Sequence, residues 1–178
     1  MKKRIGMGVL GFLLVALGTL EANAQRRGGQ TVQPASLTPA ERGWILQLRE
    51  EEKLARDVYL TLAKRWNVKI FSNIAKSESN HMAAVKNLIV KYGLPDPVVK
   101  DTVGAFTNPA FAALYKDLVA AGSVSIVEAY EVGIIIEEMD IEDLTEALLE
   151  IQKVDVRTVF ENLLSGSENH LAAFESQL

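Results

Sequence analysis

Apolar residues recur at alternating spacings of three and four along most of the chain after residue 38, the pattern of helices that bury one face. The first of these helices has a clear start, since Thr38-Pro39-Ala40-Glu41 offers an N-cap hydroxyl, a first-turn proline and a capping-box acid. No alternating β-branched run or Asn-Gly turn follows, so no hairpin is expected. We therefore predict an all-α protein.

Cap and turn residues divide this helical region into four long helices and one short one. Gly93, Pro95 and Pro97 end the second helix, and Asn108-Pro109 opens the short one. Ser125 with Glu128 and, further on, Asp155 are predicted to cap the last two helices. The expected helices cover about residues 39–66, 72–93, 109–122, 126–151 and 155–178. Four long helices with one long connection, which contains the short helix, match a four-helix bundle with a crossover.

Each long helix is expected to carry polar residues inside its apolar stripe. These interruptions are Glu52, then Glu78 with His81, then Glu137, and finally Ser167 with His170. An ionised carboxylate that leaves water without a partner costs several kcal/mol or more. Three carboxylates that face one core therefore need cations or protons.

An internal repeat relates the two halves of this region. Residues 71–85 (FSNIAKSESNHMAAV) align without gaps to residues 160–174 (FENLLSGSENHLAAF), and the alignment pairs His81 with His170. These are the only two histidines of the chain. Two helix pairs related in this way would bring two sets of carboxylate and histidine ligands face to face, as in carboxylate-bridged dimetal bundles.

Several of these stretches resemble a known family: residues 51–59 (EEKLARDVY), 71–74 (FSNI), Glu78-x-x-His81, Gly133 through Ile141, and Asn169-His170-Leu171. They are similar to the DUF2202 family, a bacterial and archaeal group of ferritin-like proteins, over about residues 44–174. The resemblance implies a ferritin-like four-helix bundle with a long crossover between its second and third long helices. It also carries metal-ligand roles to Glu52, Glu78, His81 and His170. Glu52-x-x-Ala55-x-x-x-Tyr59 further resembles the first-helix ligand motif of bacterioferritins.

The ligand of the third long helix is less sharply defined. Glu137 is our choice, because it lies on the long apolar stripe, with Glu131 and Glu138 as alternatives. A complete ferritin-like pattern has a glutamate three residues before each histidine, but Ser167 stands there in the second half. Asp140, one turn after Glu137, is expected to compensate; otherwise only one metal binds well.

Several of these residues also have an interpretation that involves no metal. Glu50-Glu51-Glu52 and Glu137-Glu138 are predicted to be mostly solvated, with one member of each run turned inward. Glu142, Asp143, Glu146 and Glu150 are predicted to form an exposed face. The histidines with their neighbours also fit buried hydrogen-bonded pairs without metal, and Tyr59 and Tyr130 fit core packing.

Carboxylates with neutral imidazoles suit iron or manganese. The leading hypothesis is a dinuclear iron site, with manganese as the alternative, in a ferroxidase- or peroxidase-like oxidoreductase that handles metal, oxygen or peroxide. The other hypothesis is a structural or interaction module on the same scaffold, and Ser167 keeps it open. Metal ions are the expected partners, and a homodimer is left open.

The N-terminal residues predict export. Lys2, Lys3 and Arg4 precede an apolar run over about residues 5–20, and Ala22-Asn23-Ala24 then offers a signal peptidase site, so cleavage is expected after Ala24. The expected product is periplasmic or secreted and has no stable membrane anchor, and residues 25–37 are expected to be a flexible tether ahead of a domain over 38–178.

Composition narrows the classes of protein and site. The chain contains no cysteine, which excludes disulfides, thiol nucleophiles and rubredoxin-type iron sites. Removing residues 1–24 takes three of 19 basic and one of 23 acidic residues, which leaves 16 and 22 and a net charge near −6. Nucleic acid is therefore not an expected partner.

Overall fold

The computed structural model describes residues 36–178, and within them the chain forms five α-helices and no strand. The helices are α1 (Pro39–Trp66), α2 (Lys69–Tyr92), α3 (Pro109–Gly122), α4 (Ile126–Glu150) and α5 (Val154–Glu175). The all-helical prediction is confirmed. The expected signal peptide and nearly all of the expected tether lie outside the described residues. No helix of residues 36–178 combines the length and the apolar character needed to cross a membrane.

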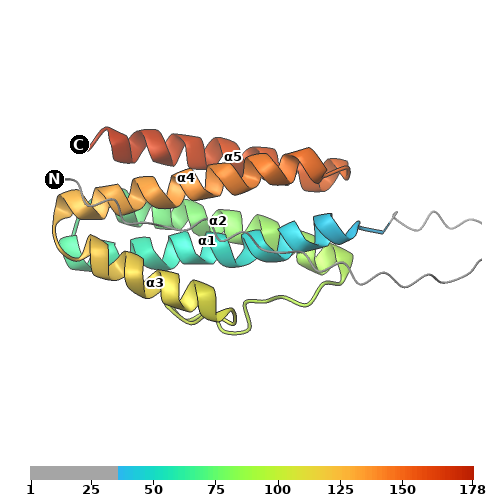
Figure 1. Ribbon diagram of the computed structural model, residues 1–178, viewed down its shortest axis with the longest axis horizontal. Coiled ribbons are helices and arrows are strands. Elements are labelled where there is room, and N and C mark those ends of the chain that lie inside the picture. Colours follow the sequence, from blue (N-terminus) through green and yellow to red (C-terminus); the bar gives the residue numbers. More distant parts are fainter. Residues whose placement is uncertain (1–35) are drawn as a thin grey trace, which may run out of the picture. The chain divides into compact units, whose positions relative to one another are not determined.

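The four long helices form a closed series of contacts. α1 packs on α2, α2 on α5, α5 on α4, and α4 on α1, and Figure 1 shows all four running along one axis. The shorter α3 packs against α1 and α4. It follows residues 93–108, which we call the crossover segment. This segment and α3 together link α2 to α4.

Two helix starts differ from the sequence prediction. α2 begins at Lys69, about one turn before the expected Ser72. α5 has Lys153 as its N-cap and not Asp155. The Asp155 carboxylate instead accepts hydrogen bonds from the Tyr92 hydroxyl at 2.9 and 2.8 Å, so it joins α5 to the end of α2.

Glu41 joins the start of α1 to the residues just before α5. Its Oε2 accepts from the backbone N–H of Thr38 at 2.8 Å and completes the predicted capping box of α1. Its Oε1 accepts from the backbone N–H groups of Gln152 and Lys153 at 2.9 and 2.8 Å, just where α5 begins. Burial alone would raise the pKa of Glu41, but these hydrogen bonds to the carboxylate lower it.

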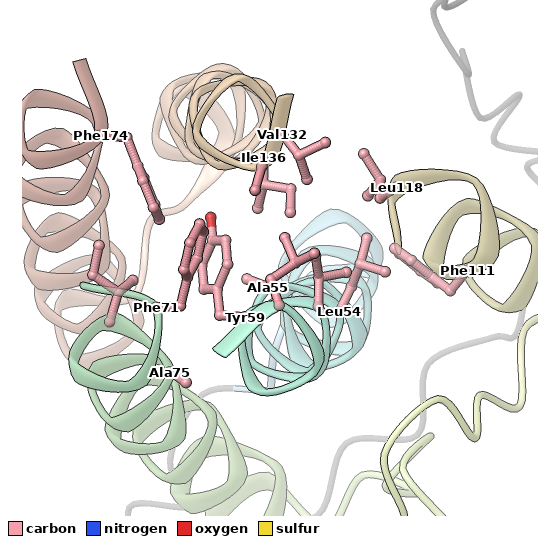
Figure 2. Close-up of a cluster of buried hydrophobic side chains, with 14 residues drawn as sticks. Leu54, Ala55, Tyr59, Phe71, Ala75, Phe111, Leu118, Val132, Ile136 and Phe174 are labelled. Atoms are coloured by element: carbon pink, nitrogen blue, oxygen red, sulfur yellow. The ribbon is translucent and has the colours of Figure 1, made fainter. Parts of the chain in front are cut away.

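The apolar core has two parts, placed at different heights along the long helices. The first core cluster contains Tyr59, Phe71 and Phe174, with Val132 and Ile136 of α4 beside them (Figure 2). The rings of Tyr59 and Phe174 lie 5.2 Å apart. The second core cluster is mostly aliphatic, with these buried members: Ile45, Leu48, Val85, Leu88, Ile89, Leu94, Leu144, Ala147, Ile151, Val156, Phe160 and Leu163. Burying such side chains stabilises a fold by about 1.5–3 kcal/mol each.

In α4, the apolar positions spaced three, four or seven residues from Glu137 are only partly buried near the middle of the helix. Tyr130, Ile134 and Ile141 are only half-buried, whereas Val132 and Ile136 are buried. Both faces carry apolar residues in this helix, so spacing alone did not decide which of them turns to the core. Glu137 is buried on either assignment.

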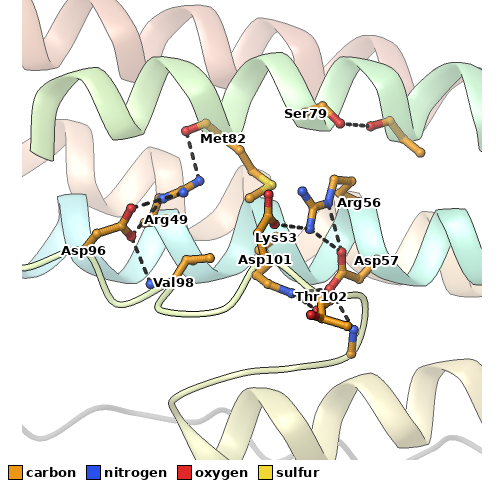
Figure 3. Close-up of polar contacts among 12 residues, drawn as sticks. Arg49, Lys53, Arg56, Asp57, Ser79, Met82, Asp96, Val98, Asp101 and Thr102 are labelled. Carbon is orange, nitrogen blue, oxygen red and sulfur yellow. Dashed lines mark hydrogen bonds and ion pairs between the residues drawn. The ribbon is translucent and has the colours of Figure 1, made fainter. Parts of the chain in front are cut away.

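A charged network covers the outer side of α1. The Lys53 ammonium donates to Asp57 and, at 3.0 Å, to the carbonyl of Thr102 in the crossover segment (Figure 3). Asp57 also accepts from Arg56 at 2.7 Å and from the backbone N–H of Gly104 at 2.9 Å. We call Lys53, Arg56, Asp57 and their partners in the crossover segment the strap network.

Arg49 extends the strap network toward α2. Its guanidinium forms an ion pair with Asp96 at 3.1 Å and donates to the carbonyl of Met82 at 3.2 Å (Figure 3). Glu50 accepts from the backbone N–H of Asn108 at 3.2 Å, next to the start of α3. The prediction of a mostly solvated Glu50-Glu51-Glu52 run was therefore wrong, since all three are buried. The crossover segment folds over α1, and periodicity within α1 carries no sign of that.

Candidate metal centre

The polar residues that interrupt the apolar stripes of the four long helices meet in one layer between the two core clusters. Along α1, Glu52 follows Leu48 of the second cluster and precedes Ala55 of the first. The same holds for Glu78 and His81 on α2, Glu137 on α4, and Ser167 and His170 on α5. All three glutamates have an exposed fraction of 0%. The layer is thus closed above and below by apolar side chains.

His81 approaches carboxylates of two helices. Its Nδ1 lies 2.9 Å from Oε2 of Glu78, three residues earlier on the same face of α2, and 3.2 Å from Oε2 of Glu52 on α1. His81 is therefore held between α1 and α2.

His170 repeats this arrangement at the other carboxylate oxygen of Glu78. Its Nδ1 lies 2.7 Å from Oε1 of Glu78 and 3.5 Å from Oε2 of Glu137. The other oxygen of Glu137 accepts a hydrogen bond from the hydroxyl of buried Tyr59 at 2.7 Å. The rings of the two histidines stack with their centroids 5.5 Å apart. The residues paired by the sequence repeat therefore lie next to each other in space.

These residues form two ligand groups that share one carboxylate. The first is Glu52, Glu78 and His81, and the second is Glu78, Glu137 and His170. Within each group the candidate ligand atoms lie within 4.8 Å of one another. The structure thus brings together five of the six predicted ligands, with Glu78 between the two groups.

The remaining candidates lie elsewhere. Asp140 is buried next to the layer but belongs to neither group. Glu131 and Glu138, the alternatives on α4, are exposed to solvent. Ser167, where the repeat would place a second shared glutamate, is fully buried, and its hydroxyl has no hydrogen-bond partner.

The carboxyl groups of the layer are strongly coupled in charge. Burial raises the pKa of Glu52 well above its usual value, and the charge of Glu78 raises it further. The pKa of Glu137 is raised by burial despite His170 beside it. Burial and the charge of Glu52 raise the pKa of Asp140 well above its usual range. Burial therefore shifts all three groups toward their protonated forms.

The pKa of Glu78 is lowered, whereas the pKa values of the two histidines are raised. Burial would raise the pKa of Glu78, but the imidazoles of His170 and His81 beside it lower that pKa to about 2. Burial would lower the pKa of His170, but Glu137 and Glu78 raise it to about 9. The pKa of His81 is raised in the same way by Glu78. These shifts favour a charged Glu78 beside a protonated His170, and they shift His81 toward its protonated form.

Two residues beside the layer were missed from the sequence. Gly166 lies against His81, since a Cβ atom at this position would come within 2.6 Å of Cε1 and Nε2 of that ring. The repeat contained a signal for it, because Gly166 aligns with Ser77 of the other half. The second missed residue is Glu51, whose side chain is buried beside Glu52. Its position relative to the apolar stripe gave no sign of this burial.

The donor set fits divalent transition metals. Oε1 of Glu52 has no hydrogen-bond partner, whereas both oxygens of Glu78 and Oε2 of Glu137 approach the histidine Nδ1 atoms as ion pairs without hydrogen-bond geometry. Buried polar atoms are otherwise almost always paired. Carboxylates and imidazoles are the ligands that iron and manganese accept. Glu52, Glu78, Glu137, His81 and His170 would therefore hold such ions, which would satisfy these oxygens.

Comparisons with a protein family, a related sequence and a solved structure give the same relationship for this chain. The family model described as "Uncharacterized protein domain (DUF2202)" matches residues 41–178. The chain is 49% identical over 142 residues to the protein MJ0754 of Methanocaldococcus jannaschii, an alignment that covers 80% of this chain and 77% of that protein. A crystal structure of MJ0754 superposes with a TM-score of 0.77 at 48% identity and covers 83% of each chain. The chain belongs to the DUF2202 family.

Proposed function

We propose that this protein is a ferritin-like four-helix bundle that binds two divalent transition-metal ions, iron first and manganese as the alternative. The single observation that carries the proposal is Glu78, which lies between two ligand groups that each add one histidine and one further glutamate. Two iron ions bound there would supply one-electron chemistry toward oxygen or peroxide. Ferroxidase- or peroxidase-like activity follows as the proposed reaction class.

The residues around the layer support this function in separate ways. Tyr59 fixes Glu137 by donating a hydrogen bond to one carboxylate oxygen, which leaves the other oxygen facing His170. Gly166 leaves room for the His81 ring. The two core clusters keep bulk water from the layer. The neighbouring carboxylates favour a proton on each imidazole, and this proton must leave before Nδ1 can bind an ion, so metal uptake is expected to release protons.

Metal analysis of purified protein tests the proposal. We expect two iron or manganese ions per chain in wild-type protein that was loaded anaerobically, and a melting temperature that rises with metal. At a free metal concentration of 100 times Kd the gain is about 2.7 kcal/mol. His81→Ala and His170→Ala should each lose the ion of their own group, whereas Glu138→Ala on the exposed face of α4 should keep both.

A metal-poor structural or interaction module is the second candidate, and Ser167 favours it. This serine stands where a second shared carboxylate would complete the symmetry of the layer. If wild-type protein binds no transition metal and gains no stability from Fe(II) or Mn(II), this candidate replaces the metal centre. If only one ion binds and Ser167→Glu restores the second, the missing carboxylate is the defect.

We also propose that the protein works outside the cytoplasm, on the basis of the sequence of residues 1–24. The intact mass of the secreted protein is expected to correspond to a chain that begins at Gln25. A product that keeps Met1 and fractionates with membranes would overturn the proposal of export.

A further inference from the structure

Three acidic residues lie beside the metal centre on the side where α1 meets α4. They are Glu51 of α1 and Asp140 and Asp143 of α4, and we call them the acidic file. None of them belongs to either ligand group. Among the ion pairs of residues 36–178, none involves a member of the acidic file.

Two members are buried without a complete set of partners. Glu51 is 7% exposed and Asp140 is 4% exposed. Oε2 of Glu51 and Oδ2 of Asp140 have no hydrogen-bond partner. A carboxylate buried this deeply without an ion-pair partner is costly, and no cationic side chain of the described residues pairs with either of these two acids.

The acidic file runs from the surface to the centre. On α4, Glu137, Asp140 and Asp143 follow one another at intervals of three residues and therefore lie on one side of the helix. Their burial increases inward, from partly exposed Asp143 through Asp140 to Glu137 at 0%.

Gln47 joins the two helices at the outer end of the file. Its Nε2 donates to Oε1 of Glu51 at 2.9 Å and to Oδ2 of Asp143 at 3.2 Å. One amide thus holds both carboxylates at the contact of α1 with α4. Glu51 is next to Glu52 in sequence, so the file ends at a ligand of the first group.

We propose that Glu51, Asp140 and Asp143 form an entry path by which hydrated divalent cations pass from solvent, between α1 and α4, to the metal centre. This inference rests on the proposed function. The file is suited to transit and not to storage, because its oxygens form no group of three close enough to hold an ion and no histidine joins them. Passage requires sites that attract a cation and still release it.

The rate of metal uptake tests the entry path, with Co(II) as a spectroscopic probe of the intact protein. Glu51→Gln combined with Asp143→Asn removes two charges from the file and keeps the shape of both side chains. We expect Co(II) uptake to slow about tenfold, since a line of like charge raises the rate of ion capture by 10-fold or more. The number of ions bound and their Kd should stay the same.

Release gives a second readout that a ligand role or a structural role would not reproduce. A path that is slower inward is also slower outward, so removal of Co(II) by a chelator should slow by the same factor. The matched control is Glu142→Gln combined with Glu146→Gln, which removes two exposed charges from α4 and should leave both rates nearly unchanged. Asp143→Asn alone, at a partly exposed position, should show part of the effect without any risk to folding.

Each outcome separates this inference from the function on which it rests. If wild-type protein binds no Co(II), the proposed metal centre fails and the entry path fails with it. If wild-type binds two ions but the file variant takes them up at the wild-type or control rate, the path alone is overturned. Loss of an ion, or faster release, would make Glu51 or Asp143 a ligand and would also overturn the path.

Discussion

The two sides of α1 both carry buried charges, but only one side carries the cations that balance them. On the outer side, Asp57 contacts Lys53, Arg56 and a backbone N–H of the crossover segment (Figure 3). On the inner side, Glu51 and Glu52 meet other carboxylates and His81, and each keeps an oxygen without a partner. The two sides are formed by neighbouring residues of one helix.

This difference separates two uses of buried charge. The strap network pairs its carboxylates within the chain, so it fixes the crossover segment to α1. The inner layer has an excess of acids over bases and is complete only with protons or added cations. Buried carboxylates without a paired cation therefore point to a functional site. A network of paired charges, such as the strap network, mainly stabilises the fold.

The largest expected effect comes from breaking the balanced side. Asp57→Ala should lower the free energy of unfolding by about 3–5 kcal/mol, because it leaves the fully buried Lys53 ammonium without its carboxylate. Chemical denaturation measures the change, and Asp117→Ala on the exposed face of α3 is the control. A loss below about 1 kcal/mol would mean that the strap network adds little to stability.

An intermediate effect is expected from pH, and groups with raised and lowered pKa values contribute with opposite signs. The pKa values of Glu52, Glu137 and Asp140 are raised in the folded protein, so the fold binds more protons than the unfolded chain above pH 4.5 and loses stability as pH rises. His170 acts in the same direction, since its contribution is complete below 6.5 and is lost as pH rises through about 9.

The melting temperature of metal-free protein should therefore fall between pH 5 and pH 9. In the strap network, Arg56 lowers the pKa of Asp101, so its contribution is lost only when pH falls below 3.8. Glu78 of the inner layer also has a lowered pKa, about 2, so its contribution to stability is complete above pH 4.5 and is lost as pH falls toward 2. Thermal melts across this range, with a chelator present, check the trend. A flat or rising curve would argue against the raised pKa values of the inner layer.

The smallest expected effect compares two helical glycines. Gly43→Ala should stabilise the protein by about 0.5–1 kcal/mol, because no atom lies within 4 Å of the added methyl group and alanine favours a helix. Gly166→Ala should give no such gain and should weaken metal binding about tenfold, since it displaces His81. Thermal melts and metal titration of both variants test the pair. Equal stabilisation by both would show that His81 moves aside freely.

The sequence predicted those parts of the structure that depend on residues close together in the chain, such as helix caps and apolar stripes. Thr38 with Glu41 formed the expected capping box, and the end of α2 at Gly93 follows from its left-handed backbone, with φ of 63°. The five residues of the two ligand groups were found because a charge within an apolar stripe is visible at helical spacing, and because the repeat paired the histidines.

The missed parts depend on contacts that are distant in sequence. Glu50 is buried where the backbone N–H of Asn108 reaches it, and the Asp155 carboxylate accepts from Tyr92 of α2 and does not cap α5. In α4, two faces carry apolar residues, so spacing alone does not show that the face with Val132 and Ile136 is the buried one. Spacing within a helix describes which residues share a face and does not say what will cover that face.

Glu41 has a consequence for how the protein opens in solution. Its single carboxylate accepts the backbone N–H groups of Thr38, Gln152 and Lys153, which lie at the starts of α1 and α5. The first turn of α1 cannot fray without freeing the two other amides at the same moment. Amide hydrogens of two segments more than a hundred residues apart in sequence therefore belong to one cooperative opening unit, and they are expected to exchange with solvent deuterium as a set.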